Sequence, residues 1–222
     1  MRLRWGSREG PQTYQNSYPP SSNYGNSNFD VRNAFKRNIV YELPFGHGKR
    51  FLNKNWLVDE VVGGWQLSGT ILLSTGNPFT VHSSQNTYAQ GGGAFPKVTG
   101  VSAKPKGGRN YFEWFNPAAF SLPANRTFGN EKRNQLYGPG LDEENLSASK
   151  YFTIYNQIKL QIRADATNAF NHPSYGLPNT NLSPCKGQVV GEAYCATAAG
   201  SQQINGTTVG GRAVQLGARL QF

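Results

Sequence analysis

Strict alternation of apolar and polar side chains marks the last residues of the chain. In the terminal sequence GGRAVQLGARLQF, Val214, Leu216, Ala218, Leu220 and Phe222 are apolar and lie two residues apart, and the residues between them are polar or small. A period of two is that of a β-strand, whose successive side chains point to opposite faces. The pattern therefore predicts a strand that runs to the end of the chain.

Four earlier segments alternate in the same way. They predict strands at about 31–43, 61–75, 145–154 and 157–170. Arg37 interrupts the apolar side of the first segment, and Leu72 interrupts the polar side of the second. Only residues 155–157 separate the last two segments, so we expect these strands to form a tight hairpin.

The 157–170 segment shows this two-sidedness most clearly. One side carries only aliphatic and alanine side chains, and the other carries only polar or charged ones. The apolar side consists of Ile158, Leu160, Ile162, Ala164 and Ala166, and the polar side of Lys159, Gln161, Arg163, Asp165 and Thr167. A half-buried soluble strand and a membrane-barrel strand both alternate in this way, so the segment alone does not distinguish them.

The connections between the predicted strands differ sharply in length. Those at 44–60 and 155–157 are moderate or short, whereas those at 77–143 and 171–208 are long and polar. Loops of this length are uncommon in compact soluble domains. Outer-membrane barrels combine tilted strands of about 9–11 residues with short turns at one rim and long loops at the other.

These features predict an all-β chain. We expect a loop or partial strand at 1–30, followed at 31–222 by an antiparallel transmembrane β-barrel segment. About five long strands would cross the outer membrane, and the two long connections would be extracellular loops.

Composition and charge narrow the functional classes. The 222 residues include 11 Tyr, 13 Phe, 26 Gly and 13 Pro, a mixture that favours strands and turns. The net charge of +10 suggests nucleic-acid binding, but Lys and Arg are dispersed, so we expect no nucleic-acid partner. The opening residues lack the apolar core of a signal peptide, which indicates either a cytoplasmic protein or a true start elsewhere.

Two cysteines, Cys185 and Cys195, lie in the polar 171–208 segment. A metal site normally needs more closely spaced pairs and more ligands. A disulfide that closes a small loop in an oxidising compartment is the favoured interpretation, with free thiols as the alternative.

Catalytic chemistry finds little support in the sequence. His47, His82 and His172 are scattered, and each lies in a predicted loop or turn, so we expect neither an enzyme nor a cofactor or metal. The acidic run at 142–144 fits either a cation site at the junction of a loop and a strand or a solvated patch, and the patch is favoured.

Several motifs in order carry a family resemblance. They are DVRNAFKRNIVYELPFGHGKRF, GGWQLSGTILLSTGNPFTV, FNPAAFSLP, FGNEKRNQLYGPGLDEENLSASKYF, LQIRADATNAFNHPSYGLPNT and GRAVQLGARLQF. Together they resemble the C-terminal end of the barrel of TonB-dependent outer-membrane receptors, most closely the Oar-like group common in acidobacteria. The resemblance extends over residues 28–222 and is weakest in the loops.

The resemblance implies a fragment of a larger transporter. Receptors of this class have about 22 strands around a plug, so five strands cannot close the barrel. The plug and the segment that contacts the TonB complex are not found in this sequence. The implied function is uptake of an unknown extracellular substrate with TonB-transduced energy, in contact with outer-membrane lipid and without a cofactor.

The resemblance also assigns roles to residues. Phe222, with Leu220 and Leu216, would form the signal that the barrel-assembly machinery reads. The side chains expected to line the lumen are Gln161, Arg163, Asp165, Gln215 and Arg219. Trp65, Tyr151 and Phe152 are expected in aromatic girdles at the membrane interface. In the motif NAFNHPSYG, Asn168, Asn171 and His172 are expected to cap backbone groups at the outer rim.

Two other functions stay open at this point. The first is a surface or adhesion protein whose loops bind a matrix without transport. The second is a soluble β-sandwich that serves as a binding module, although its strands should be shorter, with turns every 8–12 residues or so.

Overall fold

The computed structural model describes residues 24–46, 48–51, 60–84, 95–155, 157–185, 187–195 and 202–222, so His47 and most of the predicted 1–30 loop lie outside the described residues. The chain divides into two compact units. We call the first the sheet unit; its described residues fall within 33–74, 141–174 and 207–222. The second, the insert unit, has its described residues within 24–32, 75–140 and 175–206.

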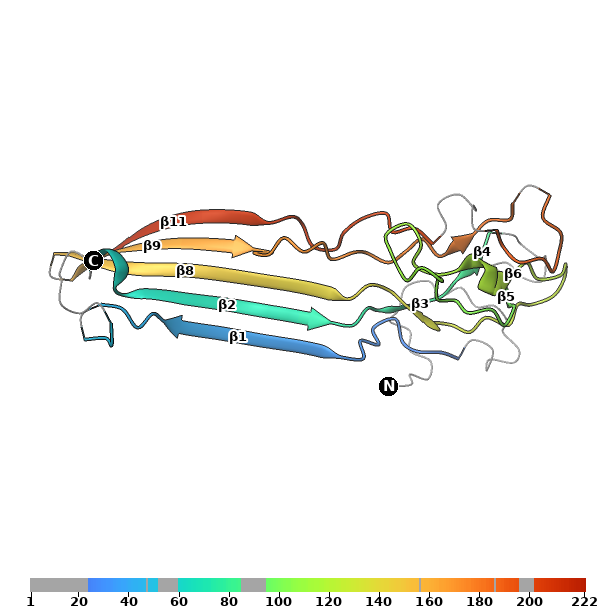
Figure 1. The fold of residues 1–222 in the computed structure, drawn as a ribbon, viewed down its shortest axis with the longest axis horizontal. Helices are drawn as coiled ribbons and strands as arrows, with labels where there is room; N and C mark the ends of the chain where they lie inside the picture. Colours follow the sequence, from blue (N-terminus) through green and yellow to red (C-terminus); the bar gives the residue numbers. More distant parts are fainter. Residues whose placement is uncertain are drawn as a thin grey trace. The chain divides into compact units, whose positions relative to one another are not determined.

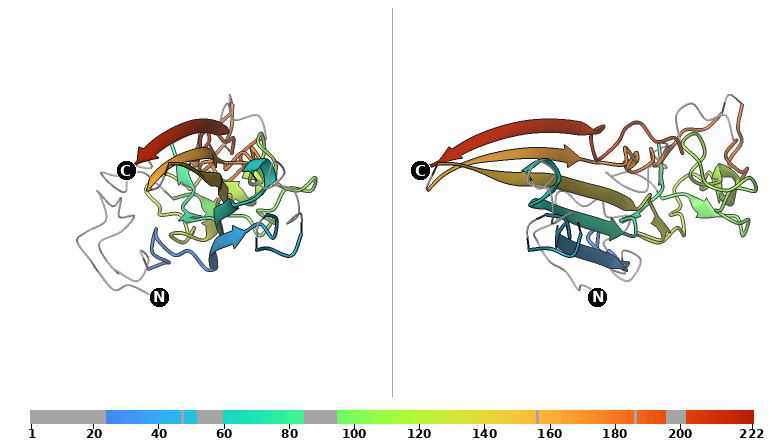
Figure 2. Two further views of the ribbon diagram at one scale, coloured as in Figure 1. Left: turned by 90° about the vertical axis from the view of Figure 1, so that its left-hand side faces the viewer. Right: turned by 60° about the vertical axis from the view of Figure 1, so that its left-hand side comes forward.

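The sheet unit is one layer of five antiparallel strands (Figure 1). Their order in the sheet is β1-β2-β8-β9-β11. Their bounds are β1 Ala34–Glu42, β2 Trp65–Ser74, β8 Leu141–Tyr155, β9 Ile158–Thr167 and β11 Ala213–Gln221. Figure 2 shows the twist of this layer, which is usual for β-sheets. All five strands predicted from alternation are confirmed.

Several strand bounds differ from the prediction by a few residues, and one of these differences concerns the acidic run. β8 begins at Leu141 instead of near residue 145, so the acidic run 142–144 belongs to the strand and not to the preceding loop. This run was misassigned because acidic side chains are rare in strands, although its register continues that of the rest of β8. The hairpin is confirmed, since Tyr155 at the end of β8 pairs with Ile158 at the start of β9.

Cross-strand pairing makes the sheet two-sided, because paired residues point to the same face. The apolar face contains Phe35, Ile39, Tyr41, Trp65, Leu67, Ile71, Leu73, Leu146, Ala148, Phe152, Leu160, Ile162, Ala164, Ala166, Val214, Leu216, Ala218 and Leu220. The polar face contains Lys36, Asn38, Gln66, Ser68, Thr70, Asn145, Ser147, Ser149, Gln161, Arg163, Asp165, Gln215 and Arg219. Charged side chains interrupt the apolar face at Arg37, Asp142, Glu144 and Lys150, and apolar side chains interrupt the polar face at Val40 and Leu72.

The insert unit has a hydrophobic core of its own. Its regular elements are short: β3 Pro78–Phe79, β4 His82–Ser83, β5 Lys97–Val98, the 3-10 helix η2 Pro117–Ala119, β6 Phe120–Ser121, β7 Leu136–Tyr137 and β10 Asn181–Leu182. The core cluster consists of Phe79, Val81, Phe115, Ala119, Phe120, Leu122, Leu182 and Tyr194. Both long connections therefore contain folded segments, and their residues pack into a common core.

Backbone pairing joins the two connections to each other within the insert unit. β4 of the first connection pairs in parallel with β10 of the second. The hydroxyl groups of Ser83 and Tyr194 are hydrogen-bonded at 2.7 Å, and the amide of Tyr194 donates to the carbonyl of Phe120 at 2.9 Å. The long loops are thus two halves of one small folded body, which their irregular sequences do not reveal.

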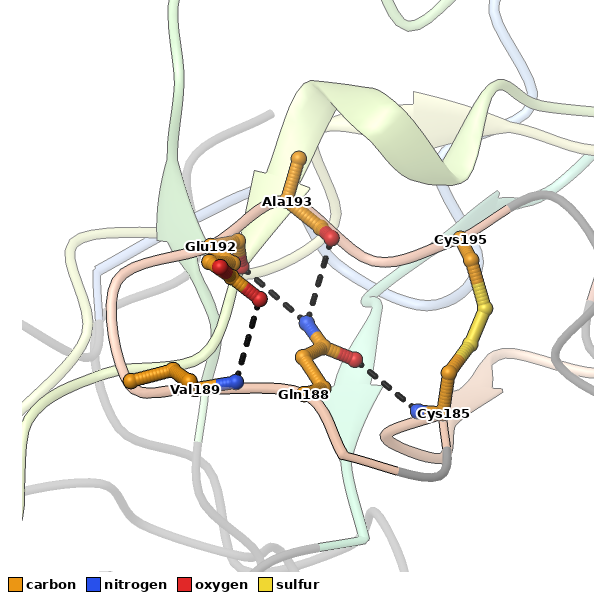
Figure 3. Close-up of a disulfide and its surroundings, with 6 residues drawn as sticks. All are labelled: Cys185, Gln188, Val189, Glu192, Ala193 and Cys195. Atoms are coloured by element: carbon orange, nitrogen blue, oxygen red, sulfur yellow. Dashed lines mark hydrogen bonds between the residues drawn. A yellow bond between two sulfur atoms is a disulfide. The ribbon is translucent and has the colours of Figure 1, made fainter.

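A disulfide closes a small loop of the insert unit (Figure 3). Cys185 and Cys195 are bonded, with a Cα–Cα distance of 6.4 Å, which confirms the favoured interpretation of the sequence. Inside this loop, the Gln188 side chain accepts from the Cys185 amide at 2.9 Å and donates to the carbonyls of Glu192 and Ala193 at 3.1 and 3.2 Å. The loop is therefore fixed by side-chain bonds as well as by the covalent link.

Gly129 is required by a close backbone approach in the insert unit. A Cβ at this position would collide with the carbonyl oxygens of Phe95 and Pro96. We expect Gly129→Ala to destabilise the insert unit by about 2 kcal/mol, because backbone atoms cannot move aside as a flexible side chain can. Gly107→Ala is the matched control, since its Cβ meets nothing within 4 Å. Urea midpoints from pulse proteolysis test this; equal midpoints for the two variants would contradict it.

Candidate functional site

The apolar face of the sheet is uncovered. Leu216 is 78% exposed and Val214 is 63% exposed, and Leu67, Leu146 and Ile162 are exposed as well. In contrast, every buried hydrophobic residue in the described part of the chain belongs to the insert unit. A soluble sheet buries one face against a second layer, whereas the outer face of a membrane barrel is solvated by lipid. This face therefore has the character of a lipid-facing surface, and a soluble β-sandwich is not the architecture observed.

The five side chains predicted to line a lumen lie on one face. Gln161 is paired with Arg219, and Asp165 with Gln215, across the β9–β11 ladder. Arg163 lies between them and its Nε contacts Asp165 Oδ1 at 2.7 Å. The shared polar face is confirmed, and its place at a lumen remains a prediction.

The aromatic residues predicted for the membrane interface do not form one group. Trp65 and Phe152 lie on the apolar face, with Phe152 opposite Leu160. Tyr151 pairs with Gln161 and lies on the polar face. Tyr151 therefore does not share the face of Trp65 and Phe152, because adjacent residues of a regular strand point to opposite sides. Membership of an aromatic girdle remains a prediction.

At one end of the apolar face, Lys150 is a buried cation that sequence reasoning missed. It pairs with Trp65 and is 3% exposed. Its ammonium group donates to the Glu60 carbonyl and lies 4.7 Å from the centre of the Phe152 ring. Trp65 Nε1 donates to the Val61 carbonyl at 3.0 Å. The helical residues 60–62 therefore supply backbone acceptors for the polar groups of Lys150 and Trp65 at this end of the face.

At the opposite end of the sheet, which we call the rim, Asn168 connects several segments by hydrogen bonds. Its side-chain Nδ2 donates to the carbonyls of His172 and Gly210, and its Oδ1 accepts from the His172 amide, each at 3.0 Å. Its own amide donates to Asn145 Oδ1 at 3.0 Å. Asn168 is 3% exposed and has φ +46°, a region that asparagine tolerates better than most residues. The side chain thus connects β8, the end of β9 and the segment before β11.

Further bonds strengthen the same rim. Asn171 Oδ1 accepts from the Arg212 amide at 3.0 Å. Ser174 Oγ exchanges hydrogen bonds with both backbone groups of Asp142, and the Ser174 carbonyl accepts from the Thr208 amide at 2.7 Å. The predicted backbone capping by Asn168 and Asn171 is confirmed, whereas the His172 imidazole lies near two carboxylates.

Those carboxylates are Asp142 and Glu144, the described residues that could hold a metal. One ligand atom from each of Asp142, Glu144 and His172 lies within 4.8 Å of the other two. The acidic run thus lies beside a histidine with which the sequence analysis did not group it. His82 lies elsewhere, in the insert unit, with its ring 5.4 Å from that of Phe95, and burial lowers its pKa.

The three residues predicted to form the assembly signal lie at the end of the chain, on or directly after β11. Leu216 and Leu220 lie on the apolar face of β11, and Phe222 follows the strand and is 97% exposed. Recognition by the barrel-assembly machinery remains a prediction.

The sheet has two open edges among the described residues. β1 and β11 are its outer strands, and each pairs with only one neighbour. The hydrocarbon core of a membrane does not tolerate an unpaired edge, because its backbone groups would lack hydrogen-bond partners. A membrane sheet of this kind must be continued on both sides until it closes.

A two-sided antiparallel sheet with an uncovered apolar face, long connections at one end and short ones at the other defines an outer-membrane β-barrel segment. In agreement, residues 4–215 match the family model described as "Outer membrane beta barrel domain". The match extends over most of the chain, and the chain belongs to this family. No curated protein and no solved structure is significantly similar to it. None of the described helices is long and apolar enough to cross a membrane.

Proposed function

We propose that this chain forms the C-terminal part of the barrel of a TonB-dependent outer-membrane transporter of the Oar-like type. In this proposal, the whole barrel takes up an extracellular substrate with energy transmitted by the TonB complex. The observation that carries the proposal is the amphipathic five-stranded sheet, apolar on one face, polar on the other and open at both edges. The remaining strands and the plug would come from outside this sequence.

The polar face supports a role beside a plug. Its cross-strand pairs place an amide opposite a guanidinium and a carboxylate opposite an amide, as in Gln161–Arg219 and Asp165–Gln215. Such groups exchange hydrogen bonds readily with the polar surface of another domain or with water. No catalytic step and no nucleic acid form part of the proposal.

The insert unit supports substrate capture on the extracellular side. Tyr111 and Phe112 are exposed, and the Tyr111 ring lies 5.4 Å from that of Phe112 and 5.7 Å from that of Tyr175. Arg109 lies 5.4 Å from the centre of the Trp114 ring. Exposed aromatic and guanidinium groups on a rigid body are typical of binding surfaces.

Adhesion without transport is the second candidate, and the insert unit favours it. The insert unit has its own hydrophobic core and a disulfide, and a flexible connection between two strands would need neither. Measuring substrate uptake by cells that carry the whole receptor distinguishes transport from adhesion. Uptake that stops when TonB is deleted or the proton gradient is collapsed supports transport, whereas ligand binding with no energy-dependent uptake supports adhesion and would overturn the transport proposal.

The two faces of β11 provide a direct test of membrane insertion. We expect a spin label attached to Leu216→Cys to be relaxed by oxygen, which concentrates in lipid, and a label on the neighbouring Gln215→Cys to be relaxed by a water-soluble nickel chelate. The reason is that the two side chains point to opposite faces. The native cysteines do not interfere, since they are bonded to each other. Equal accessibility of both labels to the chelate would contradict a lipid-facing apolar surface.

A further inference from the structure

The rim of the sheet unit brings together three metal-ligating side chains from two strand ends. Asp142 and Glu144 are two apart in β8 and therefore point to the same face. His172 follows β9, and its Nδ1 lies 3.5 Å from Asp142 Oδ2 and 3.9 Å from Glu144 Oε1. Donor atoms around a tetrahedral zinc ion are about 3.3 Å apart, so small side-chain movements would complete a coordination shell.

The burial of the Glu144 side chain is a second indication of a bound ligand, independent of the distances between the three side chains. It is only 10% exposed, and its Oε2 is buried without a hydrogen-bond partner. Asp142 Oδ1 is likewise buried and has no hydrogen-bond partner. Buried carboxylate oxygens are expensive to leave unsatisfied, and two neighbouring carboxylates repel each other. A cation bound between the two carboxylates would compensate their buried charge and remove the repulsion.

The backbone around these residues is already fixed. Both backbone groups of Asp142 are bonded to Ser174 Oγ, at 3.1 and 2.8 Å. The Glu144 carbonyl accepts from the Ala169 amide at 2.8 Å, and the His172 amide and carbonyl are both bonded by Asn168. A ligand set held in this way loses little conformational freedom when a metal binds.

From this geometry we infer a divalent-metal site formed by Asp142, Glu144 and His172 at the rim of the sheet. Two carboxylate oxygens and one imidazole nitrogen suit a first-row transition ion such as Zn²⁺ better than Ca²⁺ or Mg²⁺, which prefer all-oxygen shells. Three protein ligands leave a position for water or for a donor from a bound molecule. The site lies within the sheet unit, so it does not depend on whether the whole protein is a transporter.

Equilibrium dialysis of the full chain in detergent micelles against ZnCl₂ tests the inference. We expect one Zn²⁺ per chain, and a loss of affinity of at least about ten-fold in Glu144→Gln and in His172→Gln, since even outer-shell partners contribute that much. Glu143→Gln is the matched control: it removes the same charge one residue away, but Glu143 points to the opposite face, where it pairs with Leu72. This control should bind Zn²⁺ like the unmodified chain.

A second readout reports ligation directly. Co²⁺ bound by Asp142, Glu144 and His172 should give visible absorption bands that disappear in His172→Gln. This substitution changes a half-exposed side chain and keeps the backbone bonds of residue 172 to Asn168. Absence of stoichiometric Zn²⁺ binding, equal weakening by Glu143→Gln, or tighter binding of Ca²⁺ than of Zn²⁺ would each overturn the assignment.

Discussion

Replacing Asn168 with alanine should loosen the rim of the sheet by about 4 kcal/mol. Three side-chain hydrogen bonds are lost, each worth about 1 kcal/mol, and alanine is disfavoured in the left-handed region by about 1 kcal/mol more. The loss is large because the side chain is buried and leaves the carbonyls of His172 and Gly210 without this donor. Hydrogen exchange measures the effect, and the His172 and Arg212 amides should open at least about a hundred-fold more often.

Asn168→Gly is the matched control for this experiment. Glycine adopts the left-handed backbone without cost but also lacks the side chain, so it should recover about 1 kcal/mol of the alanine effect and no more. If glycine restored normal exchange, the contribution of Asn168 would be conformational only. If neither variant changed the exchange of these amides, the rim would be held by the bonds of Ser174 and Asn171 alone.

Glu131 should make the insert unit less stable as pH rises. The residue is 4% exposed, its Oε1 is buried without a hydrogen-bond partner, and burial raises the pKa of the carboxyl group from 4.5 to about 7. Below pH 4.5 the carboxyl group is protonated in both the folded and unfolded states, so it has no effect. Between pH 4.5 and about 7 the unfolded state releases its proton while the folded state keeps it, so stability falls by about 3 kcal/mol in total and is constant above that range.

Glu131→Gln should remove this dependence, because glutamine is uncharged at every pH. We expect the urea midpoint of the variant to exceed that of the unmodified chain at pH 8 and to equal it near pH 4. Glu113→Gln, a substitution at a less buried glutamate of the same unit, controls for a general effect of charge. A midpoint that does not vary with pH in the unmodified chain would show that the Glu131 carboxyl group is solvated.

The strands could be predicted because their side chains alternate between the apolar face and the polar face of the sheet. Side chains of β9 and β11 alternate without exception between apolar and polar or small residues, so both the existence and the faces of these strands follow from a period of two. The predicted start of β8 was wrong because its acidic residues resemble a loop. The strand around Lys150 was predicted, but the burial of this lysine on an apolar face was not. Tertiary contacts decide both cases, through the rim bonds of Ser174 and the Glu60 carbonyl.

The insert unit could not be predicted, for a different reason. Its core residues have no period, and partners such as Ser83 and Tyr194 are 111 residues apart. Local patterns carry no information on such pairings, and the short elements of this unit offer too few residues for a periodic signal. The metal-ligating cluster was hidden in the same way, since His172 meets Asp142 and Glu144 only through the pairing of β8 with β9.

The shared core of the insert unit has a consequence for the order of folding. Val81 lies before β8, whereas Leu182 and Tyr194 follow β9, so the cluster cannot be completed until most of the chain has been synthesised. Until then, the first connection must remain an open segment with exposed Phe and Val side chains, which are prone to aggregation. Residues 75–140 therefore cannot complete this core before residues 175–206 are available. Because its core joins distant parts of the chain, this body is expected to fold more slowly than one built from local contacts.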